Sequence, residues 1–231
     1  MCGRYAIATP HFSRIEQVLG TTFQAVQPRY NIAPTQNVPI IRQTEHGYEL
    51  TELRWGLIPF WSKTPTTEYS TFNARLETVA TKPAFRGPFR TRRCLIPVSG
   101  LYEWKQEGGK KQPYFITGAD DEGIALAGLW DEWRDSSGFT LASCTIIVGP
   151  ANERIAPIHD RLAIILPETA YAAWLNPKSD LEQITGLMQP HPSDQMRCWP
   201  VSTAVNQARN NSPELIEPLC SKPPMTGIGS T

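Results

Sequence analysis

The chain has 231 residues, and its 22 Lys and Arg balance its 22 Asp and Glu, so the formal net charge at pH 7 is zero. Hydrophobic residues make up 40% of the sequence, which excludes intrinsic disorder and lets a chain of this length bury roughly 70% of its unfolded surface. No run approaches the roughly 20 apolar residues of a membrane span, and the first ten residues lack the pattern of a secretory signal. Without a basic excess, nucleic-acid binding would need a local basic patch.

The spacing of cysteine and histidine argues against disulfides and metal sites. Five cysteines stand at positions 2, 94, 144, 198 and 220, an odd and scattered set that favours a reducing compartment. The sequence contains no CxxC, and its four histidines have no zinc-ligand spacing. We therefore expect no metal and no cofactor.

Frequent Pro and Gly favour short strands and turns over long helices. In chain order, β-branched and aromatic runs predict strands at residues 4–8, 38–42, 48–53, 93–97, 101–105, 114–117, 124–130, 139–148, 162–166 and 198–201. The Gly108-Gly109 turn predicts a hairpin between the fifth and sixth of these strands. Helices are predicted at residues 13–19, 152–156, 168–174 and 181–188.

These elements lack the strand–helix alternation of a doubly wound sheet. We predict an α+β fold, a single β-rich domain with a curved, barrel-like antiparallel or mixed sheet core flanked by short helices. Residues 1–220 form this domain, and residues 221–231 are expected to be a flexible C-terminal tail.

Cys2 is the candidate nucleophile with the most distinctive chemistry. Removal of Met1 would place an α-amine and a thiol on adjacent carbons, with ordinary pKa values of roughly 8 and 8.5. The thiol can act as a nucleophile with the amine as its base. Alternatively, the amine forms an imine with an aldehyde and the thiol closes a thiazolidine ring on it. A small buried residue at the start of the chain is the competing interpretation.

Two further motifs admit a structural and a functional interpretation. In the segment Asn73-Ala74-Arg75-Leu76-Glu77-Thr78, the spacing alone favours the start of a helix capped by Asn73. The functional alternative is a site in which Asn73 hydrogen-bonds a ligand and Arg75 holds a phosphate. Glu103 stands in a predicted strand among aromatic residues. It lies either on a solvated face or in a partly desolvated site, where a raised pKa would suit an acid or base.

The remaining candidates are weaker as isolated motifs. His159-Asp160-Arg161 is either a surface loop with a local ion pair or a histidine tuned near pH 7. Residues 85–93 contain four Arg and two Phe, which suits phosphate binding and base stacking, although a solvated loop is the commoner explanation. Trp55 is predicted in the core, and Trp61 is predicted to be exposed.

Seven short motifs occur in an order that is typical of one family. They are Met1-Cys2-Gly3-Arg4-Tyr5, Arg29-Tyr30-Asn31-Ile32-Ala33-Pro34, Trp55-Gly56-Leu57-Ile58-Pro59, Asn73-Ala74-Arg75-Leu76-Glu77-Thr78, Arg93-Cys94-Leu95-Ile96-Pro97, Gly100-Leu101-Tyr102-Glu103-Trp104 and His159-Asp160-Arg161. The sequence resembles the SOS response-associated peptidase (SRAP) family of abasic-site processing proteins. The resemblance includes residues 199–202 and 212–216 and so extends from Cys2 to about Leu219.

The resemblance implies a covalent mechanism. Family members bind single-stranded DNA and crosslink to abasic sites through a thiazolidine at the N-terminal cysteine, which shields the strand during the response to DNA damage. The family is also associated with lyase-type β-elimination and with removal of its own N-terminal Met, the origin of the peptidase name.

The family's functional residues have counterparts here. Cys2 matches the nucleophile, Asn73 and His159 match groups that engage the abasic sugar, and Glu103 matches the catalytic acid. Arg4, Arg75 and Arg161 match phosphate contacts, and Trp61 resembles an aromatic residue that stacks on a flanking base.

Three departures from the family pattern affect the expected shape of the DNA groove. Val148-Gly149 stands where a Thr is frequent, Leu162-Ala163 follows His159-Asp160-Arg161 where a Pro is common, and Asn206-Gln207 replaces a frequent Gly-Asn. None removes a proposed catalytic group.

Other functions compete with the covalent one. Cys2 after Met1 would also suit an N-terminal-nucleophile amidotransferase, although the chain has no room for a synthetase domain. A cysteine protease using Cys2 with His159 and a non-enzymatic binder of single-stranded nucleic acid are further alternatives. The resemblance implies single-stranded DNA with abasic sites as partner, no membrane and a monomer. The expected location is the cytoplasm, at the nucleoid, in a bacterium and the nucleus in a eukaryote.

Overall fold

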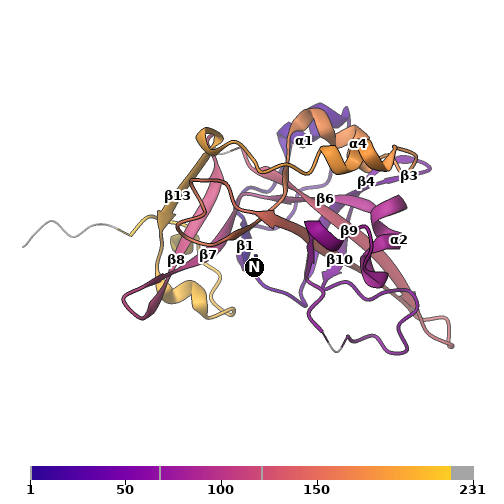
Figure 1. The fold of residues 1–231 in the computed structure, drawn as a ribbon, viewed down its shortest axis with the longest axis horizontal. Coiled ribbons are helices and arrows are strands. Elements are labelled where there is room, and N and C mark those ends of the chain that lie inside the picture. The colour runs from indigo at the N-terminus through magenta and orange to yellow at the C-terminus, as the bar shows by residue number, and fades with distance from the viewer. Residues whose placement is uncertain (1, 68, 121, 220–231) are drawn as a thin grey trace, which may run out of the picture.

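The computed structural model describes residues 2–67, 69–120 and 122–219, which include two β-sheets and several short helices (Figure 1). The predicted tail, residues 221–231, lies outside the described residues. Within them, no helix is long and apolar enough to span a bilayer, and no group of three or more His, Cys, Asp or Glu is placed to hold a metal ion.

The first sheet has five antiparallel strands and contains the start of the chain. Its order is β13 (Met196–Pro200), β8 (Lys110–Gly118), β7 (Gly100–Glu107), β1 (Tyr5–Ile7) and β2 (Arg29–Ile32). Although β1 has only three residues, strands pair with it on both sides. The residues just before β1 are therefore held at an inner strand of the sheet.

The second sheet closes on itself and confirms the predicted barrel-like core. Each strand of the ring pairs with the next and β9 pairs with β10, in the order β10 (Thr140–Pro150), β4 (Gly47–Trp55), β3 (Asn37–Thr44), β6 (Arg93–Val98) and β9 (Ile124–Arg134). All these pairs are antiparallel except β10–β4, which is parallel. The sheet is mixed, and its closure leaves no open edge within the ring.

Three short strands attach to this ring. They are β5 (Asn73–Arg75), β11 (Arg161–Ala163) and β12 (Ile165–Leu166). β5 pairs in parallel with β10, β11 pairs with β10 and β12 pairs with β9. Two segments with candidate site residues, 73–75 and 159–161, are thus brought to the same strand, β10.

Short helices flank the barrel, as predicted. The α-helices are α1 (Ser13–Leu19), α2 (Pro83–Thr91), α3 (Tyr171–Leu175) and α4 (Leu181–Gly186), and the 3-10 helices are η1 (Leu76–Thr78), η2 (Glu168–Ala170), η3 (Ser193–Gln195), η4 (Thr203–Asn206) and η5 (Pro213–Leu215). The core is continuous inside and around the ring and includes Ile40, Leu95, Leu129 and Ile146, all fully buried.

Most predicted elements are confirmed, including the hairpin at Gly108-Gly109, where both glycines have positive φ angles of 53° and 80°. Three assignments are wrong. Residues 152–156 form a single turn, in which the Asn152 side chain accepts from the Ile155 N–H, because Pro157 follows at once. Asn73 caps no helix and instead begins β5, whose pairing with β10 depends on residues far away in the sequence.

The third wrong assignment is the solvated loop at residues 85–93. Residues 83–91 form α2, which begins with Pro at a favoured first position and buries Ala84, Phe85 and Phe89. The sequence then enters β6 through Arg93, which is buried, with only 2% of its surface exposed. The basic run therefore divides between an exposed helix face and the core.

Arg93 joins three elements through its guanidinium. Its Nε donates to the Trp174 carbonyl at 2.7 Å and its Nη1 donates to the Phe89 carbonyl at 2.8 Å, and further bonds reach the carbonyls of Arg90 and Asn176. These carbonyls lie at the ends of α2 and α3, where helices leave acceptors unpaired.

We predict that Arg93→Met lowers the free energy of unfolding by about 3 kcal/mol, because Met fills the volume but leaves buried carbonyls unpaired. Chemical denaturation measures the change, with Arg134→Met, which has 67% of its side chain exposed, as the control. An effect of Arg93→Met no larger than that of Arg134→Met would contradict this role.

Candidate functional site around Cys2

The Cys2 side chain is fully buried and precedes β1, from which Gly3 and Arg4 separate it. Burial raises the pKa of its thiol well above the usual range, and the nearby Glu103 carboxylate raises it further. The backbone N–H of Arg4 donates to the sulfur, which acts in the opposite direction without cancelling the rise in pKa. At neutral pH the thiol is therefore protonated, and it needs a base to react as a thiolate.

Glu103 is buried beside Cys2, which rules out the solvated face considered from the sequence. It lies on β7, the middle strand of the first sheet, after the fully buried Leu101 and Tyr102, and only 1% of its surface is exposed. Burial raises the pKa of its carboxyl from 4.5 to about 7, and the negative charge of Asp160 acts in the same direction. Glu103 can therefore both donate and accept a proton near pH 7.

Asn73 contacts the main chain of Cys2. Its Nδ2 donates to the Cys2 carbonyl at 2.7 Å, so β5 fixes the position of the candidate nucleophile. Its Oδ1 is buried and accepts no hydrogen bond from the described residues. Because an unpaired buried acceptor is costly, this oxygen is suited to a donor on a ligand.

The Asn73 side chain lines a cavity of about 560 Å³, which we call the Asn73 cavity. Its lining is aromatic and basic and comprises Trp61, Tyr69, Ser70, Asn73, Arg75, Lys82, Pro83, Ala84 and Phe85. The volume is in the range of small-molecule and cofactor sites. Three residues singled out from the sequence, Trp61, Asn73 and Arg75, therefore share one cavity.

His159 lies at the entrance to β11 with its Nδ1 held by the backbone of Arg161. The Arg161 N–H is 2.9 Å from Nδ1 and the Arg161 carbonyl is 3.1 Å from it. Burial lowers the pKa of the imidazole below its usual range, so the ring is neutral at pH 7. The Asp160 carboxylate lies 3.1 Å from Nδ1 and also acts on Glu103, which places the 159–160 segment near Glu103.

The three candidate phosphate-binding arginines have different surroundings. Arg75 is exposed on the rim of the Asn73 cavity. Arg161 forms an ion pair with Glu77. Arg4 is half-buried, and its Nη1 donates to Asn31 Oδ1 at 2.6 Å and to the Val205 carbonyl at 2.8 Å.

Asn31 is a positioning residue that the sequence analysis did not single out. Besides accepting from Arg4, it donates through Nδ2 to the carbonyls of Val205, Gln207 and Asn210. Its place in the motif at residues 29–34 is the only signal that sequence offered for it.

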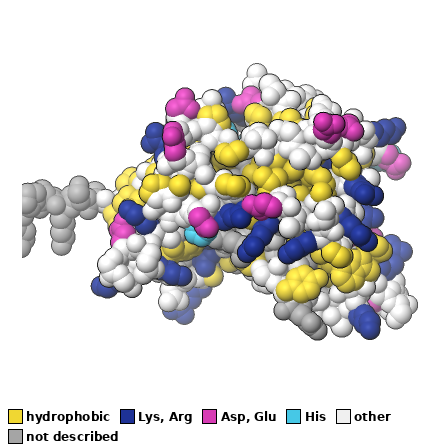
Figure 2. Space-filling view, in the orientation of Figure 1, with side chains coloured by type: hydrophobic (Ala, Val, Ile, Leu, Met, Phe, Trp, Pro, Cys, Tyr) yellow, Lys and Arg dark blue, Asp and Glu magenta, His cyan; other side chains and the backbone are white. Residues whose placement is uncertain are grey.

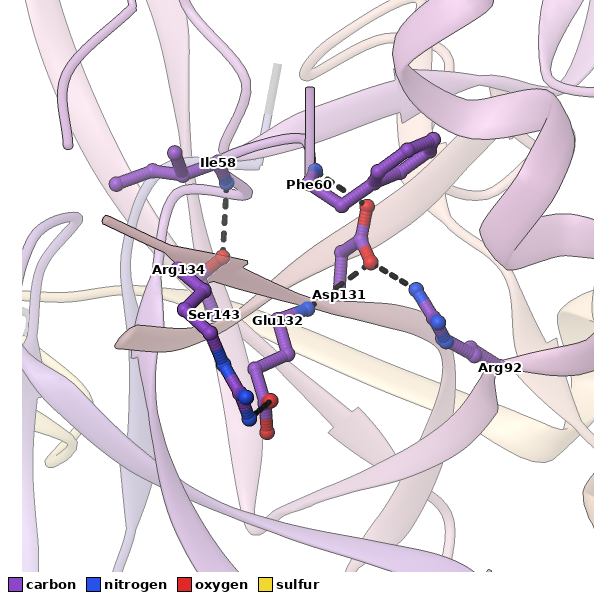
Figure 3. A network of polar contacts seen from close by, with 7 residues as sticks. All are labelled: Ile58, Phe60, Arg92, Asp131, Glu132, Arg134 and Ser143. Atoms are coloured by element: carbon purple, nitrogen blue, oxygen red, sulfur yellow. Dashed lines mark hydrogen bonds and ion pairs between the residues drawn. The ribbon is translucent and has the colours of Figure 1, made fainter. Parts of the chain in front are cut away.

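Trp61 is 48% exposed, as predicted, whereas Trp55 is buried in the core. The loop that carries Trp61 is anchored to β9 and β10 (Figure 3): Asp131 accepts from the Phe60 N–H at 3.0 Å, and Ser143 accepts from the Ile58 N–H at 2.8 Å. Arg92 forms an ion pair with the other oxygen of the buried Asp131. Asp131 is thus a second positioning residue that the sequence did not reveal.

One face of the molecule has a row of basic side chains (Figure 2). Figure 2 shows a histidine flanked by acidic and basic side chains, and a line of Lys and Arg side chains that extends from it toward a hydrophobic cluster over the loop between β4 and β5. The chain is neutral as a whole, so this face is a local basic patch of the kind that phosphate binding requires.

Two of the departures from the family pattern lie on the paired strands β10 and β11. Val148 and Ala163 are opposite each other in the β10–β11 pair, and both are buried. The third departure, Asn206-Gln207, contacts residues next to the site. Asn206 Oδ1 accepts a hydrogen bond from the Trp104 indole at 2.7 Å, and the Gln207 carbonyl accepts one from Asn31.

Solved structures share this fold. A protein of Bacteroides thetaiotaomicron has a TM-score of 0.81 and 26% sequence identity, covering 94% of this chain and 100% of that chain. A protein of Bordetella bronchiseptica has a TM-score of 0.76 at 26% identity, covering 87% of this chain and 100% of that chain.

Proteins with an assigned role are also similar. The abasic site processing protein YoqW of Bacillus subtilis is 41% identical, with 94% of this chain and 99% of YoqW covered. The abasic site processing protein YedK of Escherichia coli is 31% identical, with 83% of this chain and 85% of YedK covered. The abasic site processing protein HMCES of Gallus gallus is also 31% identical, with 84% of this chain and 67% of HMCES covered. Residues 1–208 match the family described as SOS response associated peptidase (SRAP). The chain belongs to this family.

The raised pKa of Glu103 predicts a pH-dependent cost to stability. The folded protein binds the Glu103 proton more tightly than the unfolded chain, so this site destabilises the fold as the pH rises from 4.5 to about 7. The full difference is about 3 kcal/mol. We expect Glu103→Gln to gain stability relative to the wild type over this interval, measured by urea denaturation at pH 5 and pH 8. A difference between the two proteins that does not change with pH would contradict the assignment.

Proposed function

We propose that this protein processes abasic sites in single-stranded DNA by forming a covalent thiazolidine crosslink through Cys2. The observation that carries the proposal is the convergence of Asn73 and Glu103 on Cys2, one through a hydrogen bond to its carbonyl and the other through the charge that acts on its thiol. The names of the relatives YoqW, YedK and HMCES support abasic sites as the target.

The reaction starts with the sugar. An abasic deoxyribose is mainly a cyclic hemiacetal, and only its open form offers an aldehyde. When His159 Nδ1–H donates to the Arg161 carbonyl, 3.1 Å away, Nε2 has the lone pair of the neutral ring and takes the proton of the anomeric hydroxyl. The bond between C1′ and O4′ then breaks, O4′ takes a proton from solvent, and the His159 imidazolium releases its proton to solvent. The neutral state of the ring at pH 7 suits this role as a base.

Removal of Met1 frees the amine of Cys2, which attacks the C1′ aldehyde to give a carbinolamine. Glu103 in its protonated form donates to the hydroxyl of the carbinolamine, water leaves, and a protonated imine remains beside the Glu103 carboxylate. The Cys2 sulfur then attacks the imine carbon and closes the five-membered ring, and the Glu103 carboxylate takes up the proton of the thiol. Glu103 ends in its starting state, which its pKa of about 7 permits.

The other groups hold the strand. Asn73 Oδ1, buried and without a partner among the described residues, accepts from a sugar hydroxyl or from the Cys2 amine. Arg75, together with Arg4 and Arg161, takes the phosphates on either side of the abasic residue, and Trp61 stacks on a neighbouring base. Lyase-type β-elimination from the imine, removal of Met1 by the protein itself and action as a monomer complete the proposal.

We expect Met1-processed wild-type protein to form an adduct with an oligonucleotide that carries one abasic site. The adduct resists denaturation without borohydride, and its mass is the sum of the two components less one water. Cys2→Ala retains the amine and should yield only an imine that borohydride traps, and a form that retains Met1 should yield no thiazolidine. Denaturing gels and intact mass spectrometry measure these products.

Glu103→Gln should slow adduct formation by about 100-fold, the lower range for loss of a general acid–base group. Glu107→Gln, an exposed carboxylate on the same strand, should react like the wild type. Full thiazolidine formation by Cys2→Ser would refute the proposal. If processed wild-type protein gave no adduct but released ammonia from glutamine, an N-terminal-nucleophile hydrolase would replace it.

A further inference from the structure

A second cavity lies beside the Asn73 cavity. It measures about 320 Å³, and its lining comprises Phe60, Trp61, Pro83, Arg86, Gly87, Pro88, Arg90 and Asp131. We call it the α2 cavity. Trp61 and Pro83 line both cavities, so these two side chains form the partition between them. A strand that leaves the Asn73 cavity across Trp61 enters the α2 cavity.

The α2 cavity has an uncompensated positive charge. Arg86 and Arg90 are four residues apart on α2 and therefore lie on the same helix face. Both are exposed, and neither forms an ion pair within the described part of the chain. Like charges at this spacing destabilise a helix, and an anion bound between them would remove that repulsion.

The acidic residue in the lining does not cancel this charge. Asp131 has 1% of its side chain exposed, and its two oxygens accept from Arg92 and from the N–H groups of Phe60 and Glu132 (Figure 3). Its charge is therefore neutralised by its own partners.

The same cavity offers flat apolar surfaces. Phe60 is 61% exposed and Trp61 is 48% exposed, although large aromatic side chains usually bury most of their surface. The loop is fixed by the Asp131 and Ser143 hydrogen bonds and by the Trp133 indole, which donates to the Ser62 carbonyl at 2.7 Å. Exposed rings on a fixed loop beside two free arginines are the elements of a site for single-stranded nucleic acid.

We infer that the α2 cavity binds the nucleotide next to the abasic residue on one side only, with its base against Phe60 and Trp61 and its phosphate between Arg86 and Arg90. The inference rests on the proposed function, since it assigns the abasic residue to the Asn73 cavity. This assignment makes recognition of the strand directional. With the abasic residue in the Asn73 cavity, the strand can pass Trp61 into the α2 cavity in only one 5′-to-3′ direction.

The test uses two short oligodeoxynucleotides, one with nucleotides only on the 5′ side of a terminal abasic residue and one with nucleotides only on its 3′ side. Binding is measured by fluorescence anisotropy with full-length Cys2→Ala, which forms no thiazolidine. The abasic residue in both oligonucleotides is a tetrahydrofuran analogue, which has no aldehyde and so forms no imine. In that background, Arg86→Ala/Arg90→Ala is compared with Lys110→Ala/Lys178→Ala, which removes two exposed charges that line neither cavity.

We expect the arginine pair to lose about tenfold in affinity for one of the two oligonucleotides and not for the other. The slope of log affinity against log salt for the sensitive strand should fall by about 0.7 for each phosphate contact removed. Phe60→Ala should weaken the same strand without changing this slope, because it removes stacking and no charge.

Equal losses for both strands, or losses no greater than those of the lysine pair, would overturn the inference. Failure of this inference about the α2 cavity is distinguishable from failure of the proposed function. A wild-type protein that forms no adduct, while its Cys2→Ala form binds one strand through Arg86 and Arg90, would refute the crosslink and retain the α2 cavity as a binding site.

Discussion

The parallel pairing of β10 with β4 and β5 is the constraint on which the rest of the structure depends. In an otherwise antiparallel ring, this pairing closes the barrel, and closure removes the exposed edges that an open sheet of this size would present. The β10–β5 pairing sets the register of Asn73, which lies opposite Ile146. Asn73 in turn donates a hydrogen bond to the Cys2 carbonyl and so holds the start of the chain. Barrel closure and placement of the nucleophile therefore depend on neighbouring segments of the same strand, β10.

Burial gives the site its reactivity and reduces its stability. Desolvation raises the pKa of the Cys2 thiol and of the Glu103 carboxyl and lowers that of the His159 imidazole, so all three groups are driven toward their neutral forms. An isolated charge is costly in a site of low dielectric constant, so the neutral forms are the resting states from which the proton transfers start. A solvated carboxylate at position 103 would remain ionised at neutral pH and could not act as an acid.

Sequence patterns predicted the elements whose signals are local. Alternating and β-branched runs located the long strands, and the paired glycines located the β7–β8 hairpin. β5 was missed because three residues carry no periodicity and its partner strand is more than 70 residues away. α2 was missed because Gly87 and Pro88 oppose helix formation, although Ala84, Phe85 and Phe89 have the spacing of a buried helix face. The motif order singled out Cys2, Asn73 and Glu103 as candidates. Neither the burial of Glu103 nor the contacts of Asn31 and Asp131 could follow from it, because they depend on segments far apart in the sequence.

The anchoring of the Phe60–Trp61 loop affects how the protein meets a flexible partner. A single strand loses conformational entropy when it binds, and a mobile loop would add its own loss. Here Asp131 and Ser143 accept hydrogen bonds from the loop backbone, and these bonds form when the protein folds. Binding of a single strand then loses the conformational entropy of the strand but not that of the loop. The surface is therefore held in place before a ligand arrives, and under the proposed function differences in affinity among strands would reflect the flexibility of the DNA rather than that of the protein.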